Sequence, residues 1–242
     1  MVLRALMNIR MPGAMQEDVI KVQDEFLKEE TREKGIVSPD MIPTVAKEYG
    51  SSHPAADKIS VWQGDITRLQ TGAIVNAANS QMLGCFVPCH KCIDNAIHSA
   101  AGIQLREECH HYIKRRRSRC GAGYAEPTGQ AVLTGGYNLP AEYVIHTVGP
   151  IVNGIVNDGH RRDLRSCYES VLKCCVANRI RSVAFCCIST GEFHFPNEEA
   201  ARIAVETVTG FMEKHAVYFD RVIFNVFKDL DKRLYEKEIR RM

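Results

Sequence analysis

The pattern of apolar and polar positions divides the chain into two parts. Residues 14–34 carry apolar side chains at helical spacing, with Glu and Lys between them, which predicts an amphipathic helix. Residues 36–57 contain three prolines and little periodicity, so we expect a connecting segment there. We predict an N-terminal helical extension over residues 1–57 and a main domain over residues 58–242.

Beyond residue 58, short apolar runs alternate with longer amphipathic stretches. Strands are predicted at residues 59–62, 73–76, 130–134, 143–148, 182–188 and 221–227. Helices are predicted at residues 93–117, 160–178, 197–215 and 229–241, and the pair Ala101-Gly102 could interrupt the first of them. Alternating strands and helices imply a mostly parallel sheet that helices cover on both faces. In such sheets, ligands bind beyond the carboxyl ends of the strands.

Composition limits the class of protein. The chain has 242 residues, 45% of them hydrophobic and 25% charged, as in an ordinary globular protein. Its net charge of +2 is too small to favour a nucleic acid as partner, and we expect no membrane span or signal peptide. Cys174-Cys175 and Cys186-Cys187 are adjacent pairs in apolar segments, which favours reduced cysteines and a cytoplasmic protein.

The most informative segment is a short cluster of soft metal ligands. Cys85, His90 and Cys92 fall within eight residues, and Cys89 is a fourth candidate. Thiolate and imidazole favour zinc, and three protein ligands with an open position are typical of a catalytic site. We therefore expect Zn²⁺ on Cys85, His90 and Cys92. A structural zinc with Cys89 as fourth ligand, or ordinary reduced cysteines in a buried loop, are the alternatives.

Other motifs carry a resemblance to a known family. They are Gly64-Asp65-Ile66-Thr67, Val75-Asn76-Ala77-Ala78-Asn79, Asp94-Asn95-Ala96-Ile97-His98 and Ile188-Ser189-Thr190-Gly191. Together they resemble the macrodomain family, an ADP-ribose-binding module, over roughly residues 58–240. The Cys/His cluster replaces the family's usual glycine-rich loop, and this departure resembles the zinc-dependent branch that hydrolyses ADP-ribose from proteins. The resemblance implies a three-layer α/β/α macrodomain with a mostly parallel mixed central sheet.

The resemblance also implies how each motif meets ADP-ribose. Asp65 would accept a hydrogen bond from the adenine amino group, and residues 189–193 would hold the diphosphate. Asn79 and Asp94 are the predicted catalytic residues: Asn79 would fix the distal ribose, and Asp94 would orient the attacking water or the zinc-bound group. The predicted ADP-ribose contacts are Asp65, Ile66, Asn79, Cys92, Ile93, Asp94, Ser189, Thr190, Gly191, Glu192 and Phe193.

Each of these positions also has a purely structural interpretation. Asp65 could be a turn or capping residue, and Asp94 a helix N-cap. Glu192 stands where family members often have an apolar residue, and its charge is unfavourable near a diphosphate unless it points at solvent, the zinc or another partner. His98, one helical turn beyond Asp94, is expected to be a packing or hydrogen-bonding residue. The basic run 114–119 is expected to be a solvated helix end.

We expect a zinc-dependent hydrolase that removes mono-ADP-ribose from protein side chains, with an Asp or Glu linkage favoured by the resemblance. In microbes, members of the zinc branch resemble partners of sirtuin-type transferases, which makes a lipoyl-carrier protein a candidate substrate. The alternative is a non-catalytic reader that binds ADP-ribose and in which zinc only shapes the loop.

Overall fold

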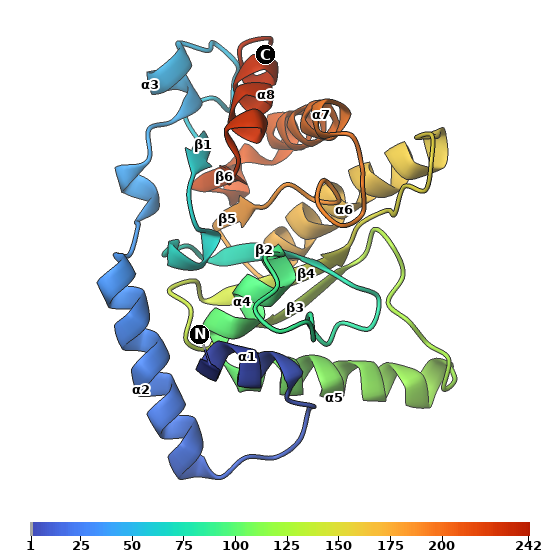
Figure 1. Ribbon diagram of the computed structural model, residues 1–242. Coiled ribbons are helices and arrows are strands. Elements are labelled where there is room, and N and C mark those ends of the chain that lie inside the picture. The colour runs from blue at the N-terminus through green and yellow to red at the C-terminus, as the bar shows by residue number, and fades with distance from the viewer. Residues whose placement is uncertain (1) are drawn as a thin grey trace.

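A mixed sheet runs through the computed structural model, which describes residues 2–242 (Figure 1). Within these residues, six strands are arranged in the order β1-β6-β5-β2-β4-β3. Their bounds are β1 Ile59–Gln63, β2 Ala73–Ala78, β3 Ala131–Gly135, β4 Tyr143–Val148, β5 Ser182–Phe185 and β6 Arg221–Val226. All neighbouring pairs are parallel except β3 and β4. The predicted mostly parallel mixed sheet is therefore confirmed.

Helices cover both faces of this sheet (Figure 1). One face carries α4 (Ile93–Ala101) and α5 (Ile103–Cys120), with α1 (Val2–Ile9) and α2 (Glu17–Lys34) packed outside them. The other face carries α6 (Asp158–Ala177), α7 (Asn197–His215) and α8 (Asp229–Ile239). None of the helices in the described residues is long and apolar enough to cross a membrane.

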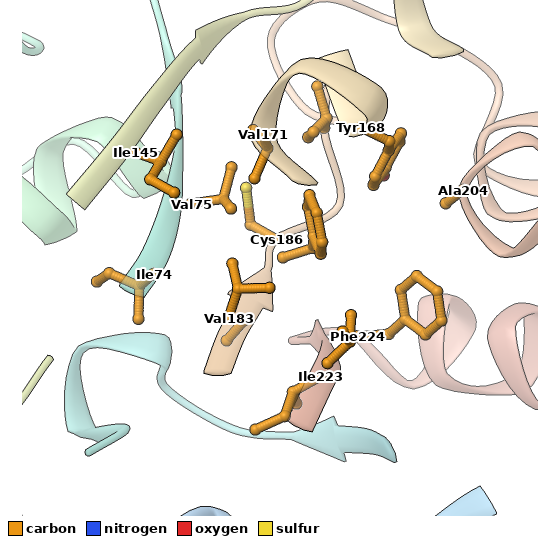
Figure 2. Packing of buried hydrophobic residues seen from close by; sticks show 14 of the residues in the cluster. Ile74, Val75, Ile145, Tyr168, Val171, Val183, Cys186, Ala204, Ile223 and Phe224 are labelled. Carbon is orange, nitrogen blue, oxygen red and sulfur yellow. The ribbon is translucent and has the colours of Figure 1, made fainter. Parts of the chain in front are cut away.

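The buried core lies on both faces of the sheet, and Figure 2 shows the part of it that packs against α6 and α7. Val75 and Cys186 point toward Val171 and Tyr168 of α6, whereas Ile74, the neighbour of Val75, points to the other side of the sheet. Successive strand side chains face opposite sides, so a strand covered on both faces must be apolar throughout. Burying each such aliphatic side chain stabilises the fold by about 1.5–3 kcal/mol.

Several predicted boundaries need correction. The interruption that Ala101-Gly102 suggested in the helix at residues 93–117 lies at Gly102, whose φ of +97° is unfavourable for other residues, and the helix beyond it continues to Cys120. The strand predicted at residues 182–188 stops pairing at Phe185, although Cys186 and Ile188 stay buried. The connecting segment contains a short helix, α3 (Val45–Tyr49), and α1 was not predicted at all.

The connecting segment is tied to the domain. Val37 forms an isolated parallel bridge with Leu69, and Ile42 and Val45 are buried. Whether residue 58 marks a domain boundary stays a prediction.

The fold places the ends of five strands together. Because β1, β6, β5, β2 and β4 are parallel, their carboxyl ends meet at one edge of the sheet. The loops that leave this edge, together with the first turn of α4, contain all the predicted site residues.

Candidate functional site

The loop between β2 and α4 brings the predicted metal ligands together. One ligand atom each from Cys85, His90 and Cys92 lies within 4.8 Å of the others, and Cys85 Sγ is 3.7 Å from His90 Nδ1. All three side chains are half-buried. Ligand atoms of a tetrahedral zinc lie about 3.3–3.8 Å apart at the usual Zn–S and Zn–N lengths. The three ligand atoms are therefore within about 1.5 Å of the spacing that a tetrahedral zinc would need.

The pKa of the Cys92 thiol reflects the partial burial of this loop. Partial burial raises the pKa of Cys92 to about 12, against the opposing hydrogen bond from the Asn95 amide and with a smaller contribution from the neighbouring Cys85. Cys92 Sγ accepts that hydrogen bond at 3.4 Å and so caps α4. Cys92 is therefore both a donor atom of the cluster and the start of the helix that carries Asp94.

A second, buried cluster fits a metal less well. His98, Cys109 and His146 also approach one another within 4.8 Å. However, Asn76 Nδ2 donates to His146 Nδ1 (3.1 Å), so His146 Nε2 carries the proton and donates to Thr134 Oγ1 (2.9 Å). Both ring nitrogens are already used, and burial lowers the pKa of His146 to about 3. The cluster is therefore neutral, and within it the hydrogen bonds to Asn76 and Thr134 fix the ring of His146.

Asp94 lies at the junction of the two clusters. It is buried, and Asn76 Nδ2 and Asn79 Nδ2 donate to its two oxygens at 2.8 and 3.2 Å. Burial raises the pKa of Asp94 to about 6, against the opposing effect of these hydrogen bonds and of the Arg106 charge. The interpretation of Asp94 as a helix N-cap is wrong, because Cys92 occupies that position. Asp94 is held by side chains, as a functional carboxylate would be.

Asn79 and His98 complete the surroundings of Asp94. Asn79 Nδ2 also donates to Gly84 O (3.1 Å), and its Oδ1 accepts from the Gln81 amide (3.0 Å), so Asn79 also shapes the loop. His98 Nε2 lies 3.5 Å from Asp94 Oδ1, although neither ring nitrogen makes a hydrogen bond within residues 2–242. Gly84 must lack a side chain, because a Cβ there would lie 2.8 Å from the His98 ring and its φ is +77°.

Asp65 lies at the other end of the same edge, after β1. Its Oδ1 accepts from the Thr67 amide (3.0 Å) and from Thr67 Oγ1 (2.7 Å), so the capping role is real. Both bonds go to Oδ1, and the residue is half-buried at the rim. Ile66 is buried beside it.

The loop after β5 is compact and strained. Ser189 and His194 have φ values of +65° and +54°, and the Ser189 carbonyl accepts from the Phe195 amide at 3.0 Å. Ser189 Oγ is buried and has no hydrogen-bond partner among the described residues. Strain of this kind persists only where surroundings impose it, and it clusters at ligand sites. Phe193 is half-buried against the core.

Glu192 connects this loop to the metal cluster. Its Oε1 lies 3.6 Å from His90 Nε2, while His90 Nδ1 faces Cys85. The carboxylate of Glu192 thus points at His90, a member of the metal cluster. Such a partner is one way to accommodate this charge near a diphosphate. A carboxylate on the far nitrogen of a ligating histidine is a common outer partner at zinc sites.

Three residues of this region were not predicted from the sequence. Gly149, after β4, faces Ser189, and a Cβ there would overlap Ser189 Oγ. Phe227, directly after β6, is 74% exposed next to the strand that ends before Asp65. Asn8 of α1 accepts from the Cys89 amide at 2.8 Å. The contacts of Gly149 and Asn8 join segments far apart in sequence, so no local pattern could predict them.

Comparison with known proteins shows which family the chain resembles. The family model described as Macro domain matches residues 75–204. A protein-ADP-ribose hydrolase of Treponema medium is 44% identical over 236 residues, covering 97% of this chain and 85% of that protein. Another protein-ADP-ribose hydrolase, from Staphylococcus aureus, is 42% identical, covering 98% of this chain and 84% of that protein. Human ADP-ribose glycohydrolase MACROD2 is 46% identical over 183 residues, covering 76% of this chain and 39% of that protein.

Solved structures of macrodomains are similar to this chain in fold. A Trypanosoma brucei macrodomain in complex with ADP-ribose superposes with a TM-score of 0.70 and 30% identity, covering 97% of this chain and 94% of that chain. An Oceanobacillus iheyensis macrodomain with ADP superposes with a TM-score of 0.66 and 33% identity, covering 76% of this chain and 90% of that chain.

Proposed function

Because the chain belongs to the macrodomain family, we propose that it is a protein-ADP-ribose hydrolase that works with zinc on Cys85, His90 and Cys92. The hydrolase class follows from relatives of that name that match nearly the whole chain. The single observation that supports the zinc is the convergence of two thiols and one imidazole beside the buried Asp94. That donor set is one that zinc prefers.

The chain's own residues supply position and proton handling. Asn76 and Asn79 fix the carboxylate of Asp94, so Asp94 would not need to be reoriented when the reacting ribose binds. Cys85, His90 and Cys92 would hold the zinc, which would supply Lewis-acid polarisation when bound. Asp94 orients the attacking water and accepts one of its protons as the water oxygen bonds to the ribosyl carbon and the protein carboxylate leaves with the electrons of the broken carbon–oxygen bond. Asn79 holds a ribose hydroxyl through its amide.

The nucleotide end lies along the same edge. Asp65 accepts a hydrogen bond from the adenine amino group through the oxygen that does not cap Thr67. Exposed Phe227 offers an aromatic face beside it for the adenine ring. Backbone amides of residues 189–193 hold the diphosphate, with Gly149 leaving room for the Ser189 turn.

The finer features of the substrate rest on the resemblance. We take the linkage to be an ester of mono-ADP-ribose on Asp or Glu, and a lipoyl-carrier protein to be a candidate target. Ten free cysteines and a thiolate metal site suit a reducing compartment such as the cytoplasm.

A release assay on a mono-ADP-ribosylated protein tests the function. A hydrolase releases free ADP-ribose catalytically, whereas a reader binds ADP-ribose in calorimetry and releases none. A protein that holds zinc but gives no calorimetric signal with ADP-ribose would contradict both and favour a purely structural metal site. Substrates linked through Asp or Glu, compared with one linked through Ser, would test the linkage.

A further inference from the structure

The N-terminal helix α1 contacts the metal loop, which is the segment of residues 79–92 between β2 and α4 that contains Cys85, His90 and Cys92. Figure 1 shows α1 lying against α4 and α5, close to the chain that joins β2 to α4. The contact is polar and buried: Asn8 is 1% exposed although most of its helix is exposed. A buried polar side chain must have partners, so the identity of those partners indicates what α1 does.

Asn8 joins the metal loop to α4. Its Oδ1 accepts from the Cys89 amide at 2.8 Å, and its Nδ2 donates to Ser99 Oγ at 2.9 Å. Cys89 precedes the metal ligand His90 directly, and its φ of +53° is costly for a residue with a side chain. The hydrogen bond that the Cys89 amide donates to Asn8 therefore stabilises this unfavourable backbone conformation of the loop.

Arg106 of α5 makes a second link between α1 and the same loop. Its guanidinium donates to the carbonyls of Met7, Asn8 and Arg10 at the end of α1. Its Nε also donates to Leu83 O at 2.8 Å, and the group lies 4.4 Å from the Phe86 ring centroid.

A third link supports the start of α4. Arg4 Nη2 donates to Asn95 Oδ1 at 2.9 Å, and Asn95 Nδ2 donates to Val87 O at 3.0 Å. Residues of α1 thus reach the metal loop directly at Cys89 and through Arg106 and Asn95 at Leu83, Phe86 and Val87.

From these contacts we infer that α1 stabilises the conformation of the metal loop. Asn8 is the positioning residue through which α1 increases the affinity of this loop for zinc. The inference rests on the proposed zinc centre. A preorganised loop binds a metal more tightly because less conformational freedom is lost when the ligands converge. The N-terminal extension is then part of the structure that supports the metal site.

The experiment compares Asn8→Ala with a matched control, Gln23→Ala. Gln23 is also a buried amide of the extension, but it bonds to Ile103 and Gln104 at the start of α5. Chelator competition on the intact protein should show zinc affinity about tenfold weaker in Asn8→Ala, in line with the loss of an outer support. Gln23→Ala should hold zinc like the wild type.

Amide hydrogen exchange on the zinc-free proteins provides a readout without metal. Residues 83–92 should exchange about tenfold faster in Asn8→Ala and unchanged in Gln23→Ala. Zinc affinity and loop exchange equal to wild type in Asn8→Ala, or equal losses in both variants, would overturn the inference. A wild-type protein without zinc would overturn the proposed centre and the zinc part of this inference, whereas the exchange rates would still decide whether Asn8 holds the loop.

Discussion

Replacing Asp65 separates a capping role from an adenine contact. The structure shows that Asp65 caps the turn at Thr67 through Oδ1, so Asp65→Ala is expected to lose both functions. Loss of the cap costs about 1 kcal/mol of stability. Loss of a charge-assisted hydrogen bond to adenine costs about 1.5–3 kcal/mol of binding, which corresponds to an ADP-ribose Kd weaker by roughly 10- to 150-fold.

Two further variants separate these effects. Thr67→Val removes the hydroxyl that bonds to Asp65 and leaves the carboxylate in place, so stability should fall with little change in Kd. Asp65→Asn keeps an acceptor for the cap but loses the charge, so its Kd should lie between wild type and Asp65→Ala. Calorimetry with ADP-ribose and thermal melting provide both quantities. If Asp65→Ala binds ADP-ribose like the wild type, Asp65 is only a turn residue and the adenine assignment is refuted.

Three more outcomes are expected. Asp94→Ala should slow release of ADP-ribose by about a hundredfold or more while weakening ADP-ribose binding less than about tenfold; equal losses in both measurements would mean that Asp94 only binds. Cys89→Ser should retain one zinc per chain in metal analysis, because Cys89 lies outside the ligand cluster, and loss of the zinc would make it a ligand. His146 stays neutral when folded, since burial lowers its pKa from 6.5 to about 3, and the unfolded chain therefore binds the extra proton. The free energy of unfolding should thus fall as pH drops from about 6.5 toward 3, by up to about 1.4 kcal/mol per pH unit. Urea unfolding of the chelator-treated proteins at several pH values should show a smaller dependence of this free energy on pH in His146→Gln than in the wild type.

The sequence predicted the elements better than their edges. Periodicity separated strands from helices, and Gly102 marked the break between α4 and α5. α1 was missed because it contacts the domain through its two polar residues, Arg4 and Asn8, so no apolar stripe marks its buried face. Its apolar residues Val2, Leu3, Leu6 and Ile9 stay exposed. Pairing of β5 ends at Phe185, although the apolar run continues, because burial does not require a strand partner.

In the site, residues close together in sequence could be predicted, whereas contacts between distant segments could not. Cys85, His90 and Cys92 share one loop, so their spacing alone predicted the cluster. The contact of Asn8 with Cys89 joins residues 81 positions apart, and no local pattern encodes it. Asn76 is a buried polar residue inside an apolar strand, and this was the available signal for the support beneath Asp94.

The most direct test of the account is the dependence of release on zinc. The wild-type protein would be stripped with a chelator, and zinc would be restored in steps while single-turnover release of ADP-ribose from a mono-ADP-ribosylated protein is measured. The release rate should rise with added zinc and level off at about one zinc per chain, and Cys92→Ala, checked by melting, should stay inactive throughout. Release at nearly the full rate by folded, zinc-free protein would contradict the catalytic zinc centre.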